Sequence, residues 1–227
     1  DSFDLAGDVE EAVKAFSGYL QGAPAQDARR QQARFRLARL YQSTGEFTTA
    51  AGLYLELLSE RQNASDRGGM VWAARSIVPL AQCLLADTDP ANDDLAEREL
   101  LAVLSGREFA PEAEEFRDAL VELGRYYYES GRYAQAIERL TEARERFPED
   151  REIERIRYRL ADSLRLSAND IDRGLGRAMP RAQREELERT RRDRLREASA
   201  SFDRVRTALL GREPDSLGPV ERMMLRN

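Results

Sequence analysis

The sequence of 227 residues lacks histidine altogether and contains a single cysteine, Cys83. Without histidine, Ser-His-Asp and Cys-His nucleophilic systems and histidine metal centres are excluded. One cysteine forms neither an intrachain disulfide nor a cysteine zinc site, and its apolar helical context predicts a small buried residue rather than a reactive thiol. An enzyme working with carboxylates alone is the remaining alternative. We therefore predict no catalytic activity, no cofactor and no metal site.

Long apolar runs are also missing, since no stretch approaches the roughly 18 consecutive apolar residues of a transmembrane helix. The chain shows no signal peptide, although Asp1 is not a natural start and the true N-terminus is expected upstream. Its net charge of −6 argues against nucleic acid as the main partner, because phosphate binding needs a basic surface. We therefore expect no membrane insertion and no nucleic-acid binding by this segment.

What the sequence does contain is the pattern of amphipathic helices, with 41% hydrophobic and 34% charged residues. The pattern is strongest over residues 123–148, LGRYYYESGRYAQAIERLTEARERFP. Gly124 and Ala136 are small where two helices must approach closely. Gly131 can take the left-handed conformation that ends a helix, and Pro148 stops the second helix. Large residues are expected to fill the remaining space: Leu123, Tyr127, Tyr133 and Leu140.

The same order and spacing recurs near the N-terminus, at Leu37, Ala38, Tyr41, Gly45, Phe47, Ala50, Tyr54 and Leu57. These positions resemble the tetratricopeptide repeat, a helix-turn-helix unit of roughly 34 residues that stacks into a solenoid. The resemblance implies an all-α, right-handed solenoid of about five hairpins, partial at both ends. The predicted divisions are a partial repeat 1–25, repeat 26–64, repeat 68–106 with a loop insertion 87–94, repeat 111–148, repeat 151–212 with an insertion 169–190, and a further repeat beginning at 217–227.

The repeats are longer than the family's usual period. In this respect the chain resembles tetratricopeptide repeat proteins of bacterial cell envelopes, such as the lipoprotein of the outer-membrane β-barrel assembly machinery. This resemblance leaves the bacterial cytoplasm and the periplasm or cell envelope open as compartments. The helices that we expect are the end of one helix at 1–7, then 9–21, 26–43, 47–61, 70–86 with Pro79 inside it, 95–104, 111–130, 133–147, 151–168 and a long charged helix from Pro180.

Two insertions each have a functional and a structural interpretation. The acidic loop DTDPANDD at 87–94 suggests calcium, but an EF-hand would need glycine where Asn92 stands and glutamate where Arg98 stands. A helix N-cap at Asp94 is the simpler interpretation. The charged helix after Pro180 is interpreted as a solvated protrusion, with a docking arm for a partner as the alternative.

In the tetratricopeptide repeat family, the first helix of each hairpin lines a concave groove that binds peptides and protein segments. Carried over position by position, the resemblance predicts a groove made of Gln32, Phe35, Arg39, Gln42, Arg75, Gln82, Arg125, Tyr128, Arg155, Tyr158, Asp162 and Arg165. Apolar and acidic residues at equivalent positions are Val78, Leu85, Asp118 and Val121. We hypothesise an extended ligand with some acidic residues, held by bidentate arginine contacts and tyrosine packing.

The family's lysine-and-asparagine clamp for a C-terminal carboxylate is not reproduced, because Arg125 stands where asparagine is required. A co-chaperone role is therefore not expected. We predict a non-catalytic protein-interaction scaffold with a protein or peptide partner. Two alternatives stay open: a structural self-assembly module that associates through its ends and its charged helix, and a substrate-recruiting or regulatory segment of a longer enzyme.

Overall fold

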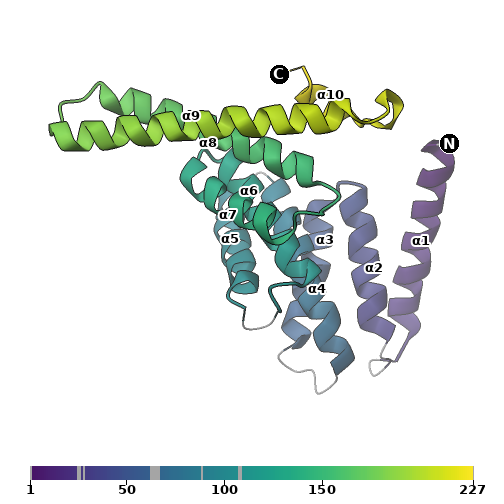
Figure 1. The fold of residues 1–227 in the computed structure, drawn as a ribbon. Coiled ribbons are helices and arrows are strands. Elements are labelled where there is room, and N and C mark those ends of the chain that lie inside the picture. Colours follow the sequence, from purple (N-terminus) through teal and green to yellow (C-terminus); the bar gives the residue numbers. More distant parts are fainter. Residues whose placement is uncertain are drawn as a thin grey trace. The chain divides into compact units, whose positions relative to one another are not determined.

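The computed structural model describes residues 2–24, 27, 29–61, 67–87, 89–106 and 109–226. Every regular element in these ranges is a helix (Figure 1). The chain forms two compact units, Asp1–Ala119 and Leu120–Asn227, and one helix crosses their boundary. The helices are α1 Ser2–Gly22, α2 Arg29–Ser43, α3 Phe47–Arg61, α4 Arg67–Ala86, α5 Pro90–Leu104, α6 Glu114–Glu129, α7 Tyr133–Arg146, α8 Ile153–Leu175, α9 Arg181–Leu210, the 3-10 turn η1 Pro214–Ser216 and α10 Pro219–Met224.

The first unit is built from neighbours in sequence. Helix α1 packs on α2, α2 on α3, α3 on α4 and α4 on α5, and α2 also touches α4. The predicted pattern positions form the core of these contacts, including Leu37, Ala38, Ala50, Tyr54, Leu57, Leu80, Ala96 and Leu100. The first helices of consecutive hairpins therefore adjoin, as the repeat pattern predicts.

The second unit repeats this order. Helix α7 packs on α8, and α8 packs on α9 along most of its length, so that the two long helices run side by side in Figure 1. Leu123, Tyr127, Ala136 and Leu140 are buried where α6 meets α7. A Cβ atom added to Gly124 would lie 2.5 Å from Leu140 Cδ2, which confirms that this position must be small.

Two predicted turns have the expected backbone. Gly45 has φ +83° and Gly131 has φ +75°. At each turn the glycine N–H donates to a carbonyl three residues back, and the next N–H donates to one five residues back. For Gly131 these bonds are 3.2 Å to Tyr128 O and, from Arg132 N, 2.7 Å to Tyr127 O. This is the Schellman arrangement that ends a helix and frees the chain to reverse.

Four predicted boundaries are wrong in the N-terminal unit, and one of them is the start of α4, which lies at Arg67 rather than Met70. Residues 2–22 form one continuous helix, so the expected break at Gly7 does not occur. Helix α5 begins at Pro90 rather than Leu95, because Asp89 caps it by accepting from Ala91 N at 3.0 Å. Proline at the first helical position needs no N–H partner. Helix α6 begins at Glu114 rather than Pro111. The expected start at Gln26 lies outside the described residues.

The insertion predicted at 169–190 is also mostly helical. Helix α8 continues through Asn169 to Leu175, and only residues 176–180 connect it to α9. The charged half of α9 packs back on this extension. Arg191 Nε lies 3.0 Å from Asp172 Oδ1, and Arg194 Nη1 donates to Ser167 Oγ. The arm is therefore a helical hairpin rather than a single solvated helix.

Two further observations bear on sites. Within the described ranges, none of the helices is long and apolar enough to cross a membrane. The same ranges contain no group of three potential metal-ligating residues. In the loop before α5, Asp87 accepts from Asp89 N and from the side chain of Asn92, so its carboxylate organises the loop.

Candidate functional site

In the first unit, the predicted groove residues on α2 and α4 meet around an aromatic pair. The Phe35 ring lies 5.3 Å from the Trp72 ring and 5.9 Å from the Tyr54 ring. The Arg75 guanidinium lies 5.4 Å from the centre of the Trp72 ring and pairs with Glu115 at 3.8 Å. An arginine over an indole face is attracted to it electrostatically. Trp72 therefore joins Phe35 and Arg75 into one surface, a link that the sequence pattern did not include.

Two of the three predicted glutamines of this unit, Gln42 and Gln82, bond directly to each other. Gln42 Nε2 donates to Gln82 Oε1 at 3.1 Å, and the hydroxyl of the buried Tyr54 donates to Gln42 Oε1 at 3.1 Å. These bonds tie α2 to α4. Arg39 is exposed on the same helix, and among the described residues no carboxylate lies within ion-pair distance of it.

Two predicted positions on these helices lie elsewhere. Gln32 lines a cavity of about 270 Å³ between α1 and α2, whose walls also include Phe16, Tyr19 and Arg36. Val78 is only 4% exposed and belongs to the core, so the expectation that it faces the groove is wrong. The helix turn that carries Val78 packs against other helices, because α4 contacts α2, α3 and α5.

Cys83 is buried, as predicted, and its chemistry gives a pH test. Burial raises the pKa of its thiol to about 11, while the nearby Arg39 acts in the opposite direction. Because the folded chain holds this proton more tightly, its contribution to stability is complete below the ordinary pKa near 9 and is lost as the pH rises through about 11. We expect the free energy of unfolding to fall by about 2 kcal/mol over this range from Cys83 alone.

Urea unfolding at a series of pH values checks this expectation, and Cys83→Ala should show a correspondingly shallower decline between pH 9 and 11. At pH 8 the native thiol should react with dithionitrobenzoate far more slowly than the thiol of the urea-unfolded chain. An equal alkaline decline in Cys83→Ala would show that other groups carry the effect.

In the second unit, Asp162 joins the predicted faces of α6 and α8. The Tyr128 hydroxyl donates to Asp162 Oδ2 at 2.7 Å, and Arg165 lies against Asp162 Oδ1, with its Nη2 at 2.6 Å. The Asp162 side chain is 13% exposed. Burial and the hydrogen bond to Asp162 raise the pKa of Tyr128 to about 12. Three of the predicted residues thus form one hydrogen-bonded group.

Arg125, which was predicted to line the groove, is held by two carboxylates of its own helix. Arg125 donates to Glu122, which is buried, and lies 2.9 Å from Glu129. Arg159 on α8 interacts electrostatically with the same two carboxylates, and burial lowers its pKa. Sequence reasoning missed Glu122, Glu129 and Arg159. Their spacing along α6 was visible, but their approach to α8 was not.

Beside Asp162, a cavity of about 700 Å³ opens between α8, α9 and the C-terminal segment. The predicted residues Tyr158, Asp162 and Arg165 line it from α8. Residues that the sequence pattern missed complete it: Phe202, Asp203, Val205 and Arg206 from α9, with Met224, Leu225 and Arg226 after them. We call these ten residues the C-terminal cavity. Groove positions were predicted only on the helices expected at 26–43, 70–86, 111–130 and 151–168, so residues of α9 and of the C-terminal segment were outside the prediction.

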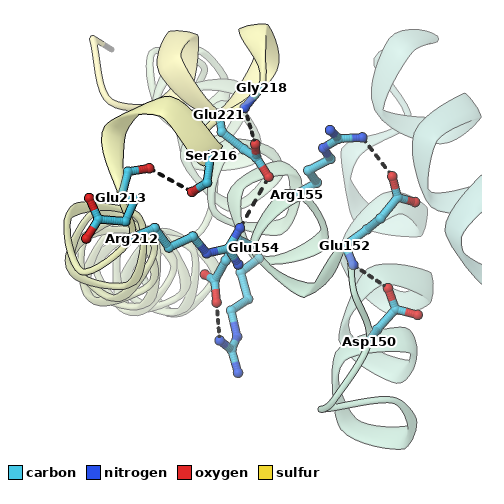
Figure 2. Close-up of polar contacts among 10 residues, drawn as sticks. Asp150, Glu152, Glu154, Arg155, Arg212, Glu213, Ser216, Gly218 and Glu221 are labelled. Carbon is cyan, nitrogen blue, oxygen red and sulfur yellow. Dashed lines mark hydrogen bonds and ion pairs between the residues drawn. The ribbon is translucent and has the colours of Figure 1, made fainter.

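The segment that closes this cavity is held by a small polar network (Figure 2). Glu221 on α10 accepts from Gly218 N at 2.6 Å and lies 3.4 Å from Arg212 Nη1. Val205, Leu209 and Leu217 form a buried cluster beneath, against which Tyr158, Met224 and Leu225 pack. The remaining predicted residue, Arg155, pairs with Glu152 at 2.7 Å.

The α6–α7 hairpin has a counterpart among known protein families. Residues 118–150, which contain most of α6 and all of α7, match the model of the tetratricopeptide repeat family. A crystal structure of a tetratricopeptide repeat protein from Parabacteroides merdae ATCC 43184 is 14% identical, with 99% of this chain and 94% of that chain covered and a TM-score of 0.30. The comparison with curated protein sequences finds no significant match.

Proposed function

We propose that this chain, in which residues 118–150 match the tetratricopeptide repeat family, is a non-catalytic scaffold that binds an extended segment of a partner protein along the first helices of its hairpins. Repeats of this family mediate protein–protein interactions. The groups that the repeat supplies here are hydrogen-bonded side chains, aromatic rings and arginines. None of the arrangements described above pairs a nucleophile with a base.

One observation carries the proposal: residues predicted to share a face do meet across consecutive first helices. Gln42 on α2 bonds to Gln82 on α4, and Tyr128 on α6 bonds to Asp162 on α8. In the second unit this face adjoins the C-terminal cavity, through Asp162 itself. Concave sites with a few convergent polar groups are the usual places for ligands.

The charge of these faces supports a partner segment with acidic residues. Arg39 is exposed. The side chain of Arg75, which lies over the Trp72 ring, is about half exposed. The side chain of Arg165 is 46% exposed despite its bond to Asp162. A carboxylate placed between planar guanidinium groups gains bidentate hydrogen bonds. Arg125 contributes less, because Glu122 and Glu129 already neutralise it.

Photo-cross-linking tests the proposal directly. Benzoylphenylalanine at Arg39 or Arg165 should capture a partner protein in a lysate of the source cells. The same group at Thr49 on α3 or Glu138 on α7, which are also exposed, should capture far less. Arg125 is left unchanged, because a replacement there would strand the carboxylates of Glu122 and Glu129 and confound binding with unfolding.

The masses of the cross-linked products separate the alternatives. Equal capture from all four positions would contradict binding along the first helices. A product of twice the chain's mass, together with a sedimentation coefficient that rises with concentration, would instead favour self-assembly. The exposed apolar side chains of Leu210, Val220 and Met223 offer a surface for that outcome.

A further inference from the structure

The C-terminal cavity has an apolar floor built from two helices and a chain end. The Tyr158 ring meets the Phe202 ring edge-on at 5.4 Å. Val205 is buried, and Met224 and Leu225 pack against the cluster that Val205 forms with Leu209 and Leu217. Aromatic rings and a flexible methionine side chain can adjust to a bulky apolar group at little cost. The floor therefore suits one large apolar side chain.

The rim of the same cavity carries more positive than negative charge. It contains Arg165, Arg206 and Arg226 against Asp162 and Asp203. Both oxygens of Asp162 already accept hydrogen bonds, from Tyr128 and Arg165, and Asp203 lies 3.3 Å from Arg206. Arg226 is exposed, and no carboxylate in the described part of the chain pairs with it. An incoming carboxylate thus finds guanidinium donors at the edge of an apolar hollow.

The size of the cavity fits part of a polypeptide. Its volume of about 700 Å³ lies within the range of roughly 300 to 1,000 Å³ that is typical of ligand sites. A phenylalanine side chain with its flanking backbone would occupy much of it. Tyr158, Asp162 and Arg165 also belong to the face along which the partner segment is proposed to lie, so the cavity continues that face without a break in the α8 helix.

We propose that the C-terminal cavity is an anchoring subsite that takes one bulky apolar side chain, aromatic by preference, from a partner protein segment with an acidic residue beside it. The ring lies on Tyr158, Phe202 and Met224, and the neighbouring carboxylate meets Arg206 and Arg226. This inference rests on the proposed scaffold function. It specifies the chemistry of the part of the partner segment that binds at the C-terminal cavity.

A designed peptide tests the subsite with the full chain. The probe is a seven-residue, fluorescein-labelled peptide with phenylalanine at its centre, an aspartate on each side, and glycine and serine elsewhere. Its controls replace the phenylalanine by alanine or both aspartates by arginine. Fluorescence polarisation should give about tenfold weaker binding for each control peptide, because each removes one half of the recognition.

The protein offers a matched pair of double variants, each with one change on α9 and one in the segment from α10 to Arg226. Arg206→Glu with Arg226→Glu should weaken binding of the probe about tenfold, because both side chains line the cavity. Arg204→Glu with Arg222→Glu makes the same change of charge at exposed positions on α9 and α10 that do not line it, and should leave affinity within about twofold. Circular dichroism confirms that all variants fold.

A spectroscopic readout locates the contact. With methionine methyl groups labelled by ¹³C, the probe should shift the Met224 resonance and leave Met179 in the connection after α8 unchanged. Equal losses in the two double variants, equal binding of the alanine peptide, or an unshifted Met224 signal at about millimolar probe would each overturn the proposal. If the probe fails while Arg39 and Arg165 still cross-link a partner, the anchor is wrong and the scaffold function stands. If cross-linking fails as well, both the anchoring subsite and the scaffold function are contradicted.

Discussion

Replacing Gly124 by valine should lower the free energy of unfolding of the second unit by about 3 kcal/mol or more, or prevent it from folding. A Cβ atom at this position would lie 2.5 Å from Leu140 Cδ2 and 2.6 Å from Leu140 Cγ. Leu140 is fully buried, so its side chain has no open space to enter. Overpacking a close core contact typically costs about 1 to 3 kcal/mol, and the branched valine adds a second clash. Gly124→Ala should cost less, because alanine favours a helix by about 1 kcal/mol over glycine.

Two further variants show whether the contact itself is responsible. Leu140→Ala alone should cost about 2 to 5 kcal/mol. Combining it with Gly124→Val should cost clearly less than the sum, because the valine then fills the space that Leu140 leaves. Gly52→Ala is the matched control, since nothing lies within 4 Å of an added Cβ in the middle of α3, and it should be neutral or stabilising. Strict additivity in urea unfolding would contradict the close approach of α6 and α7.

Replacing Asp162 by alanine should cost about 2 to 3 kcal/mol, because it removes the acceptor for both Tyr128 and Arg165. The loss of the Tyr128 bond dominates, since the half-exposed Arg165 turns to water. Asp162→Asn keeps an acceptor oxygen and should cost about half as much. Urea unfolding near pH 8 measures both variants, and Tyr128→Phe in the same background tests the coupling.

The pH dependence gives this prediction a second readout. The pKa of Tyr128 is raised to about 12, so its bond to Asp162 stabilises the fold fully below the ordinary value of 10 and loses that effect as the pH rises through about 12. In Asp162→Ala the Tyr128 pKa should fall toward 10, as followed by ¹³C labelling of the tyrosine rings. The stability difference between the variant and the original chain should shrink between pH 10 and 12. An unchanged Tyr128 pKa would show that burial alone sets it.

Much of the fold could be predicted because repeat packing is local. Each hairpin buries a small set of residues at fixed spacing, and Gly124, Gly131, Ala136 and Leu140 occupy the positions that the pattern requires. The errors fall where the chain departs from the repeat. Asp89 and Asp94 could both cap α5, and only the backbone decides between them. Helix α8 continues to Leu175 because α9 packs on the extension. The local sequence does not indicate this packing.

The candidate site divides in the same way. The family resemblance, carried over position by position, placed Gln42 with Gln82 and Tyr128 with Asp162 on the predicted face, and the structure brings each pair into hydrogen-bond contact. Spacing did not reveal that Glu122 and Glu129 hold Arg125, because a rotamer choice decides which of several neighbours an arginine meets. For the same reason Arg39, which has no such neighbour among the residues that the structure describes, is the better candidate for contact with a ligand.

By itself, the sequence determined that this chain is a set of helical hairpins without histidine or disulfide chemistry, because those properties depend on residue type and on contacts between neighbours in sequence. Only the tertiary structure decided where a ligand has room. The C-terminal cavity needs Tyr158, Phe202 and Met224, which are more than forty residues apart from first to second and lie on three elements. Such a hollow is the space left when long helices pack, and its shape follows from how α8, α9 and α10 meet rather than from the pattern of any one of them.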